Sequence, residues 1–104
     1  MNRMEKLLAF LADQPQDPFL RHALALEYQK ADRWEEAIEI WEKLLSEVPG
    51  YVGSYYHLAG ALARQNQSEK AIQWYEKGMA TARKAGDTHA FNELRSAYDA
   101  MTDS

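Results

Sequence analysis

The sequence predicts an all-α fold in which about six helices form a stack of antiparallel helix pairs. An internal repeat with a period of 34 residues runs along most of the chain. Within each repeat, apolar residues recur three and four positions apart, which is the spacing of an amphipathic helix. The chain of 104 residues contains no cysteine, so side-chain packing, rather than disulfide bonds or thiolate metal sites, holds such a fold together.

The repeat is clearest in the second helix of each predicted pair. The motif Ala37-Ile38-x-x-Trp41-Glu42-Lys43 returns 34 positions later as Ala71-Ile72-x-x-Tyr75-Glu76-Lys77. The same offset carries Leu24-Ala25 onto Leu58-Ala59 and Pro15 onto Pro49. Matches at one offset over so many positions indicate a structural unit that buries its apolar face against neighbouring units.

The first three helices are expected near residues 3–13, 18–30 and 33–47. The second should begin after Asp17, a common N-cap residue that stands directly before a proline. The third should begin at Asp32, because Glu35 follows three residues later and completes the pattern of a capping box.

The last three helices are expected near residues 52–64, 67–85 and 88–102. Asn66, with Glu69 three residues on, should begin the fifth helix, and Asp87 after Gly86 should begin the sixth. The small residues of the repeat should let paired helices approach closely, with Trp41 and Tyr75 filling the core beside them.

These residues resemble the tetratricopeptide repeat family, in particular its small bacterial-type members. The family pattern is filled once by Arg21, Leu24, Ala25, Tyr28, Ala37, Trp41 and Pro49, and again by Tyr55, Leu58, Ala59, Leu62, Ala71 and Tyr75. Arg21 replaces the usual aromatic residue, and Arg83 stands where the second repeat would end with proline. The fifth helix is therefore expected to run on past the usual stop.

Partial units flank the two full repeats. Leu7, Phe10 and Pro15 lie one period before Trp41, Leu44 and Pro49, and Phe91, Leu94 and Tyr98 repeat a first helix after a two-residue insertion. The resemblance thus implies one domain, residues 1–104, that forms a right-handed superhelical stack. It comprises a half repeat at 3–15, full repeats at 18–51 and 52–85, and a capping helix at 88–102.

The resemblance also implies that the first helix of each pair lines a concave groove for an extended peptide or a helix of a partner. The residues expected to face this groove are Phe19, His22, Leu26, Gln29, Lys30, Tyr56, His57, Gly60, Ala63, Arg64, His89, Asn92, Glu93 and Ser96. Tyr56 is a candidate aromatic anchor. Gly60 either opens space for a ligand backbone or tolerates a crowded helix crossing.

Other site chemistries are not indicated. The chain lacks a phosphate-binding glycine loop, a nucleophile elbow and a zincin motif, so neither an enzyme nor a cofactor is expected. The three histidines, His22, His57 and His89, fall one per first helix without a close ligand pair, so no metal site is expected. Lys30 and Arg64 each lie in the last turn of a helix, where a cation is favoured without a ligand.

The sequence therefore predicts a non-catalytic adaptor or scaffold that binds a protein or peptide partner. A net charge of −4 with both signs interspersed argues against nucleic acid. The N-terminal apolar run is broken by Asp13 and Pro15, so neither a membrane span nor a signal sequence is expected and the protein is expected in the cytoplasm. The alternative is a self-associating structural subunit, such as a homodimer, with contacts through Leu8, Leu11, Ile40 and Trp74.

Overall fold

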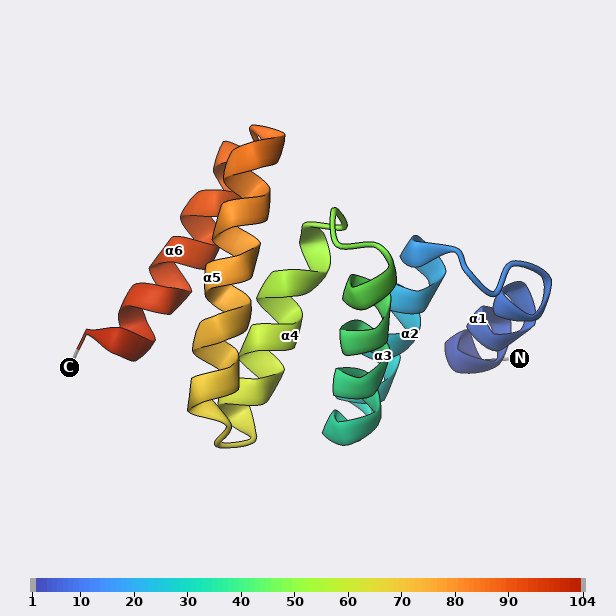
Figure 1. Ribbon diagram of the computed structural model, residues 1–104. Helices are drawn as coiled ribbons and strands as arrows, with labels where there is room; N and C mark the ends of the chain where they lie inside the picture. The colour runs from blue at the N-terminus through green and yellow to red at the C-terminus, as the bar shows by residue number, and fades with distance from the viewer. Residues whose placement is uncertain (1, 104) are drawn as a thin grey trace. The chain divides into compact units, whose positions relative to one another are not determined.

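The computed structural model describes residues 2–103, which form six α-helices joined by short turns (Figure 1). The helices are α1 Arg3–Asp13, α2 Pro18–Lys30, α3 Trp34–Glu47, α4 Gly53–Arg64, α5 Ser68–Ala85 and α6 Thr88–Thr102. No strand occurs among residues 2–103. The predicted all-α helical repeat fold is confirmed, and every helix begins and ends within one residue of the expected position.

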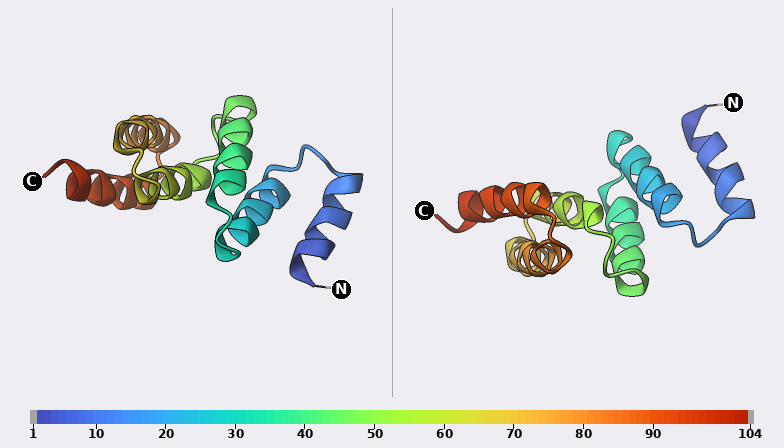
Figure 2. Two further views of the ribbon diagram at one scale, coloured as in Figure 1. Left: turned by 90° about the horizontal axis from the view of Figure 1, so that it is seen from below. Right: turned by 90° about the horizontal axis from the view of Figure 1, so that it is seen from above.

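The helices group into two compact units, Met1–Val48 with α1 to α3 and Pro49–Ser104 with α4 to α6. In the first unit, α2 packs side by side with α3 (Figure 2), and α1 lies against α2. Ala25 and Ala37 are fully buried and allow α2 and α3 to approach closely. Trp41 is also fully buried, as the sequence predicts, and fills the core beside them.

In the second unit, α5 packs against both α4 and α6. Figure 2 shows α4 and α6 in one layer and α5 on one side of them. Gly78 marks the closest approach, since a Cβ added there would lie 2.7 Å from Cβ of Tyr55 on α4 and 3.1 Å from Cδ1 of Leu94 on α6. Only glycine fits at this crossing without a shift of the helices.

For two helices, the residue predicted to cap the N-terminus is wrong, although the predicted start lies close to the observed one. Asp32 and Asn66 have φ angles of 64° and 63°, so they are not N-caps of the helices that follow. The helices α3 and α5 begin two residues later, after Arg33 and Gln67, and neither of these residues makes a side-chain capping bond.

Asp32 and Asn66 instead end the preceding helices. The residue after each of them donates its backbone N–H to a carbonyl in the last turn of the preceding helix. Arg33 donates to the Tyr28 carbonyl and Gln67 to the Leu62 carbonyl, both at 2.9 Å. This is the Schellman arrangement, which needs a left-handed residue. Asn and Asp adopt that conformation at lower cost than other residues with a side chain.

The other predicted caps are confirmed. Oδ1 of Asp17 accepts from the Leu20 backbone N–H at 3.1 Å, and Oδ1 of Asp87 accepts from that of Ala90 at 3.0 Å. Gly86 takes the left-handed position that ends α5, with φ 73°. As expected, α5 runs past Arg83 and reaches 18 residues. No helix in residues 2–103 is long and apolar enough to cross a membrane.

Candidate protein-binding surface

In the first unit, the predicted site residues lie on α2 and differ in exposure. The ring of Phe19 is 65% exposed, whereas Leu26 and Gln29 are half-buried. Lys30 is exposed, and its Nζ lies 3.3 Å from Oε2 of Glu27. An exposed pair of this kind contributes about 0–1 kcal/mol, so Lys30 remains accessible to an acidic ligand.

His22 is a structural residue as well as a surface candidate. Its Nδ1 accepts a hydrogen bond of 3.0 Å from the indole Nε1–H of Trp41, and the two rings lie 5.8 Å apart between centroids. Because the Trp41 side chain is fully buried, this bond satisfies a polar group inside the core. Substitution of His22 is therefore expected to affect stability, and it is unsuitable as a pure test of binding.

In the second unit, three of the predicted residues on α4 lie in a patch around Gly60 that the hydroxyl of Tyr75 on α5 adjoins. A Cβ added at Gly60 would have one neighbour within 4 Å, the Tyr75 hydroxyl at 3.8 Å. The Tyr56 ring is 37% exposed and meets the His57 ring edge-on, with 5.7 Å between centroids. We define the Gly60 patch as Tyr56, His57, Gly60 and Tyr75.

The surroundings of Gly60 argue against the crowded helix crossing, which is one of the two interpretations of this glycine. The crowded crossing lies at Gly78, not at Gly60, where a methyl group would make an ordinary contact. No packing constraint among residues 2–103 accounts for a glycine inside α4. The sequence alone could not separate the two glycines, because the distance between helices is set by the whole packed unit.

Two groups of the Gly60 patch, the His57 imidazole and the Tyr75 hydroxyl, are neutral near pH 7. Burial lowers the pKa of the His57 imidazole, although the negative charge of Glu93 on α6 acts in the opposite direction. Burial, followed by the influence of Tyr56, raises the pKa of the Tyr75 hydroxyl. The imidazole and the phenol can therefore each donate and accept a hydrogen bond, which suits a peptide backbone.

Apart from the half-buried Ala63, the remaining predicted residues of the second unit are exposed. Arg64 lies in the last turn of α4, and His89 and Asn92 lie in the first half of α6. Among residues 2–103, no three histidine, aspartate or glutamate side chains are placed to hold a metal ion. The surface thus presents aromatic rings, neutral hydrogen-bonding groups and single charges.

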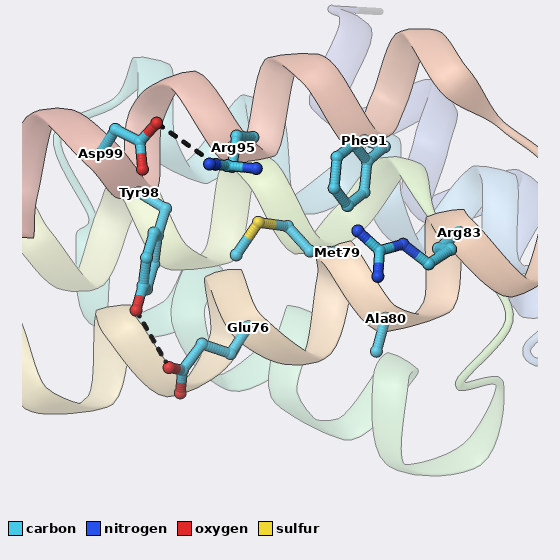
Figure 3. Close-up of a pocket in the computed structure, with 8 residues that line it drawn as sticks. All are labelled: Glu76, Met79, Ala80, Arg83, Phe91, Arg95, Tyr98 and Asp99. Atoms are coloured by element: carbon cyan, nitrogen blue, oxygen red, sulfur yellow. Dashed lines mark hydrogen bonds and ion pairs between the residues drawn. The ribbon is translucent and has the colours of Figure 1, made fainter.

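A groove between α5 and α6, with a volume of about 450 Å³, was not predicted from the sequence (Figure 3). It is lined by Glu76, Met79, Ala80 and Arg83 of α5 and by Phe91, Arg95, Tyr98 and Asp99 of α6. The Tyr98 hydroxyl donates to Oε2 of Glu76 at 3.2 Å, and the Arg83 guanidinium lies over the Phe91 ring, 4.8 Å from its centroid. The repeat pattern includes Phe91 and Tyr98, but nothing in it indicates that they line a groove.

The comparison with known families agrees with this architecture. The family model described as Tetratricopeptide repeat matches residues 28–98. The chain belongs to the tetratricopeptide repeat family. Members of this family generally serve as non-catalytic modules for protein–protein interaction, and the partner-binding role predicted from the sequence agrees with this at the level of the family.

Solved structures extend the similarity beyond the family model. The crystal structure of a tetratricopeptide repeat domain protein from Salinibacter ruber is 37% identical, with a TM-score of 0.80, over 84% of this chain and 97% of that chain. The solution structure of a protein from Bordetella parapertussis is 25% identical, with a TM-score of 0.85, over 99% of this chain and 90% of that chain. No curated protein matches this tetratricopeptide repeat chain.

Proposed function

We propose that this tetratricopeptide repeat protein is a non-catalytic adaptor or scaffold that binds an extended peptide or helix of a partner protein, with the Gly60 patch as the central contact. Gly60 is the observation that supports this proposal. A glycine inside a helix costs about 1 kcal/mol relative to alanine, and the surroundings of Gly60 would accept a methyl group. Close approach of a ligand backbone accounts for the missing side chain.

The neighbours of Gly60 supply the chemistry that such a ligand needs. The exposed Tyr56 ring offers apolar area with few rotatable bonds, as aromatic anchors at protein interfaces do. The neutral His57 and the Tyr75 hydroxyl offer donors and acceptors to peptide N–H and C=O groups. The patch therefore favours an extended, largely uncharged peptide segment.

Further contacts are proposed along the first helices of the pairs. In the second unit these are Arg64, His89 and Asn92, which are all exposed. In the first unit they are Phe19, Leu26, Gln29 and Lys30. Of the two apolar side chains in this set, that of Phe19 is the more exposed. His22 contributes to the same helix surface, while it also supports Trp41.

The test is selection of ligands from a random peptide library on the wild-type chain, followed by measurement of each Kd by fluorescence anisotropy. Gly60→Leu places a side chain over the patch and should raise Kd at least about tenfold, equivalent to ~1.4 kcal/mol. Gln73→Leu, on an exposed position of α5, is the matched control and should leave Kd unchanged. Selected peptides that bind Gly60→Leu as tightly as the wild type would exclude the Gly60 patch as the contact.

A further inference from the structure

The groove between α5 and α6 is built from one face of each helix. Its lining residues recur three and four positions apart on α5, from Glu76 to Arg83, and on α6, from Phe91 to Tyr98. The half-buried side chains of Met79 and Phe91 give it an apolar part. Its volume of about 450 Å³ lies within the range of ligand-binding clefts, about 300–1,000 Å³. The groove therefore has the size and composition of a binding site.

Two charged groups of the groove have no oppositely charged partner among residues 2–103. Glu76 accepts a hydrogen bond of 3.2 Å from the Tyr98 hydroxyl, but a neutral phenol does not balance the charge of a carboxylate. The Arg83 guanidinium lies over the Phe91 ring and makes no ion pair within this part of the chain, so its N–H groups remain available for a carboxylate. The groove can therefore pair both with an anion and with a cation.

The two charges lie toward opposite ends of the groove, with Met79 between them (Figure 3). Glu76 and Arg83 are seven residues apart on α5, which is two helical turns, or about 10 Å. The other two charged lining residues, Arg95 and Asp99, pair with each other at 3.3 Å. A complementary ligand thus has an anionic end, an apolar centre and a cationic end, spread over about 10 Å.

We propose that the α5–α6 groove binds an amphipathic helix of a partner protein, whose acidic residue pairs with Arg83 and whose basic residue, seven positions later, pairs with Glu76. Apolar residues three and four positions after the acidic one lie against Met79 and Phe91. Recognition of a helix in a groove uses contacts with this spacing. No residue of the Gly60 patch lines the groove, so this second interaction surface goes beyond the proposed function and does not depend on it.

A helix fits the groove better than an extended peptide does. In a helix, residues at positions i, i+3, i+4 and i+7 lie on one face over about 10 Å, which is the spacing of the α5 lining residues themselves. An extended chain advances about 3.3 Å per residue, so groups about 10 Å apart are three residues apart and point to opposite sides. An extended peptide would therefore direct only one of its two charges into the groove.

The order of the two charges sets the direction of the partner helix. An acidic residue is favoured near the N-terminus of a helix and a basic residue near its C-terminus, because of the helix dipole. Arg83 lies in the last turn of α5, and Glu76 lies two turns earlier. A partner helix with its acidic residue first therefore runs antiparallel to α5, with the pattern acidic-x-x-apolar-apolar-x-x-basic.

The proposed occupant is a helix of another protein and not α1 of a second copy. The helix α1 exposes Leu8 and Phe10, but its charges have the reverse order, since Lys6 stands seven positions before Asp13. To pair with the groove it would have to run parallel to α5, with its own charges opposed to its dipole. The order of charges thus favours a partner sequence that α1 does not supply.

Fluorescence anisotropy with two labelled, alanine-rich helical peptides tests the proposal. The first peptide carries Glu-x-x-Leu-Leu-x-x-Lys, and the second has its Glu and Lys exchanged. The first should bind the wild-type chain at least about fivefold more tightly, because the exchange turns two attractions between partly exposed charges into two repulsions. Equal affinities, or no saturable binding of either peptide, would overturn the proposal.

Exchange of the two groove charges gives the sharper test. Glu76→Lys with Arg83→Glu in one chain should reverse the preference, so that the second peptide binds more tightly. Peptide helicity does not explain such a reversal, because the same two peptides are compared on both chains. Glu69→Lys with Lys84→Glu, at exposed α5 positions outside the groove, is the matched control and should keep the wild-type preference. An exchanged chain that still prefers the first peptide would contradict the assignment of Arg83 and Glu76.

Chemical-shift mapping on the wild-type chain locates the peptide without any substitution. Addition of the first peptide should shift amide signals mainly along the lining residues of α5 and α6, including Met79 and Phe91. Shifts confined to Tyr56, His57 and Gly60 would place the peptide on the Gly60 patch and would overturn the groove as its site. The reverse result, shifts in the groove alone, leaves the proposed role of the Gly60 patch to its own test.

Discussion

Alanine substitution at two glycines of the second unit should change stability in opposite directions. At Gly60 the added methyl group meets only the Tyr75 hydroxyl at 3.8 Å, so Gly60→Ala should gain most of the helix-propensity difference, about 1 kcal/mol. At Gly78 the methyl group would lie 2.7 Å from Cβ of Tyr55 and 3.1 Å from Leu94. A Cβ cannot move aside as the end of a flexible side chain can, so α5 must shift away from α4.

Overpacking of this kind typically costs 1–3 kcal/mol, and the contact at Gly78 is close enough to place the cost in the upper part of that range. Subtraction of the propensity gain leaves a net destabilisation of about 1–2 kcal/mol for Gly78→Ala. Urea unfolding followed by circular dichroism measures both variants, and an unchanged m-value would show that the native and unfolded states remain comparable. A Gly78→Ala variant as stable as the wild type would refute the steric reasoning.

Three further predictions concern a turn, a buried hydrogen bond and a titration. Asn66→Ala should lower the free energy of unfolding by about 1 kcal/mol because φ at Asn66 is 63°, whereas Asn66→Gly should not destabilise; equal urea midpoints for the two variants would contradict this. His22→Ala should cost about 1–3 kcal/mol, since the buried Trp41 N–H loses its acceptor; a loss below about 0.5 kcal/mol in thermal unfolding would show that the bond is dispensable. The pKa of His57 is lowered on folding despite Glu93, so the unfolded chain binds more protons and stability falls as the pH drops through 6.5 toward the lower folded value. His57→Gln should reduce this fall in melting temperature, and an identical fall in both proteins would exclude His57 as its source.

The helices could be predicted from the sequence because the repeat period and the spacing of apolar residues are both visible in the order of residues along the chain. The bounds of α2 and α6 follow from Asp17 and Asp87, whose side chains cap the helices as expected. The prediction for Asp32 and Asn66 was wrong because these residue types suit both an N-cap and a left-handed helix stop. Each of these residues stands two positions before the next helix begins, which favours a left-handed helix stop over an N-cap. The sequence did not reveal this, because Glu35 and Glu69 complete the pattern of a capping box.

The candidate site was less accessible to sequence reasoning. The pattern placed His22 on the surface, but only the fold shows that its Nδ1 reaches Trp41. Tyr75 was assigned to the core, and it is buried, yet its hydroxyl belongs to the Gly60 patch. Such double roles depend on distances between helices, which no spacing along the chain encodes. The expectation of one domain over residues 1–104 stays a prediction, since the helices group into two units.

The packing of α1 has a consequence for the motions of the chain. Leu7 is the one residue of α1 that is buried, as Leu94 is in α6, whereas α3 and α4 each bury five or more. In contrast to α6, which packs against both α4 and α5, α1 packs mainly against α2. A helix held by so little apolar contact should open locally at a free energy well below that of global unfolding. Its amide protons should therefore exchange with solvent faster than those of α3 and α4. Opening of α1 would expose Leu7 to solvent together with the surface of α2 against which α1 packs.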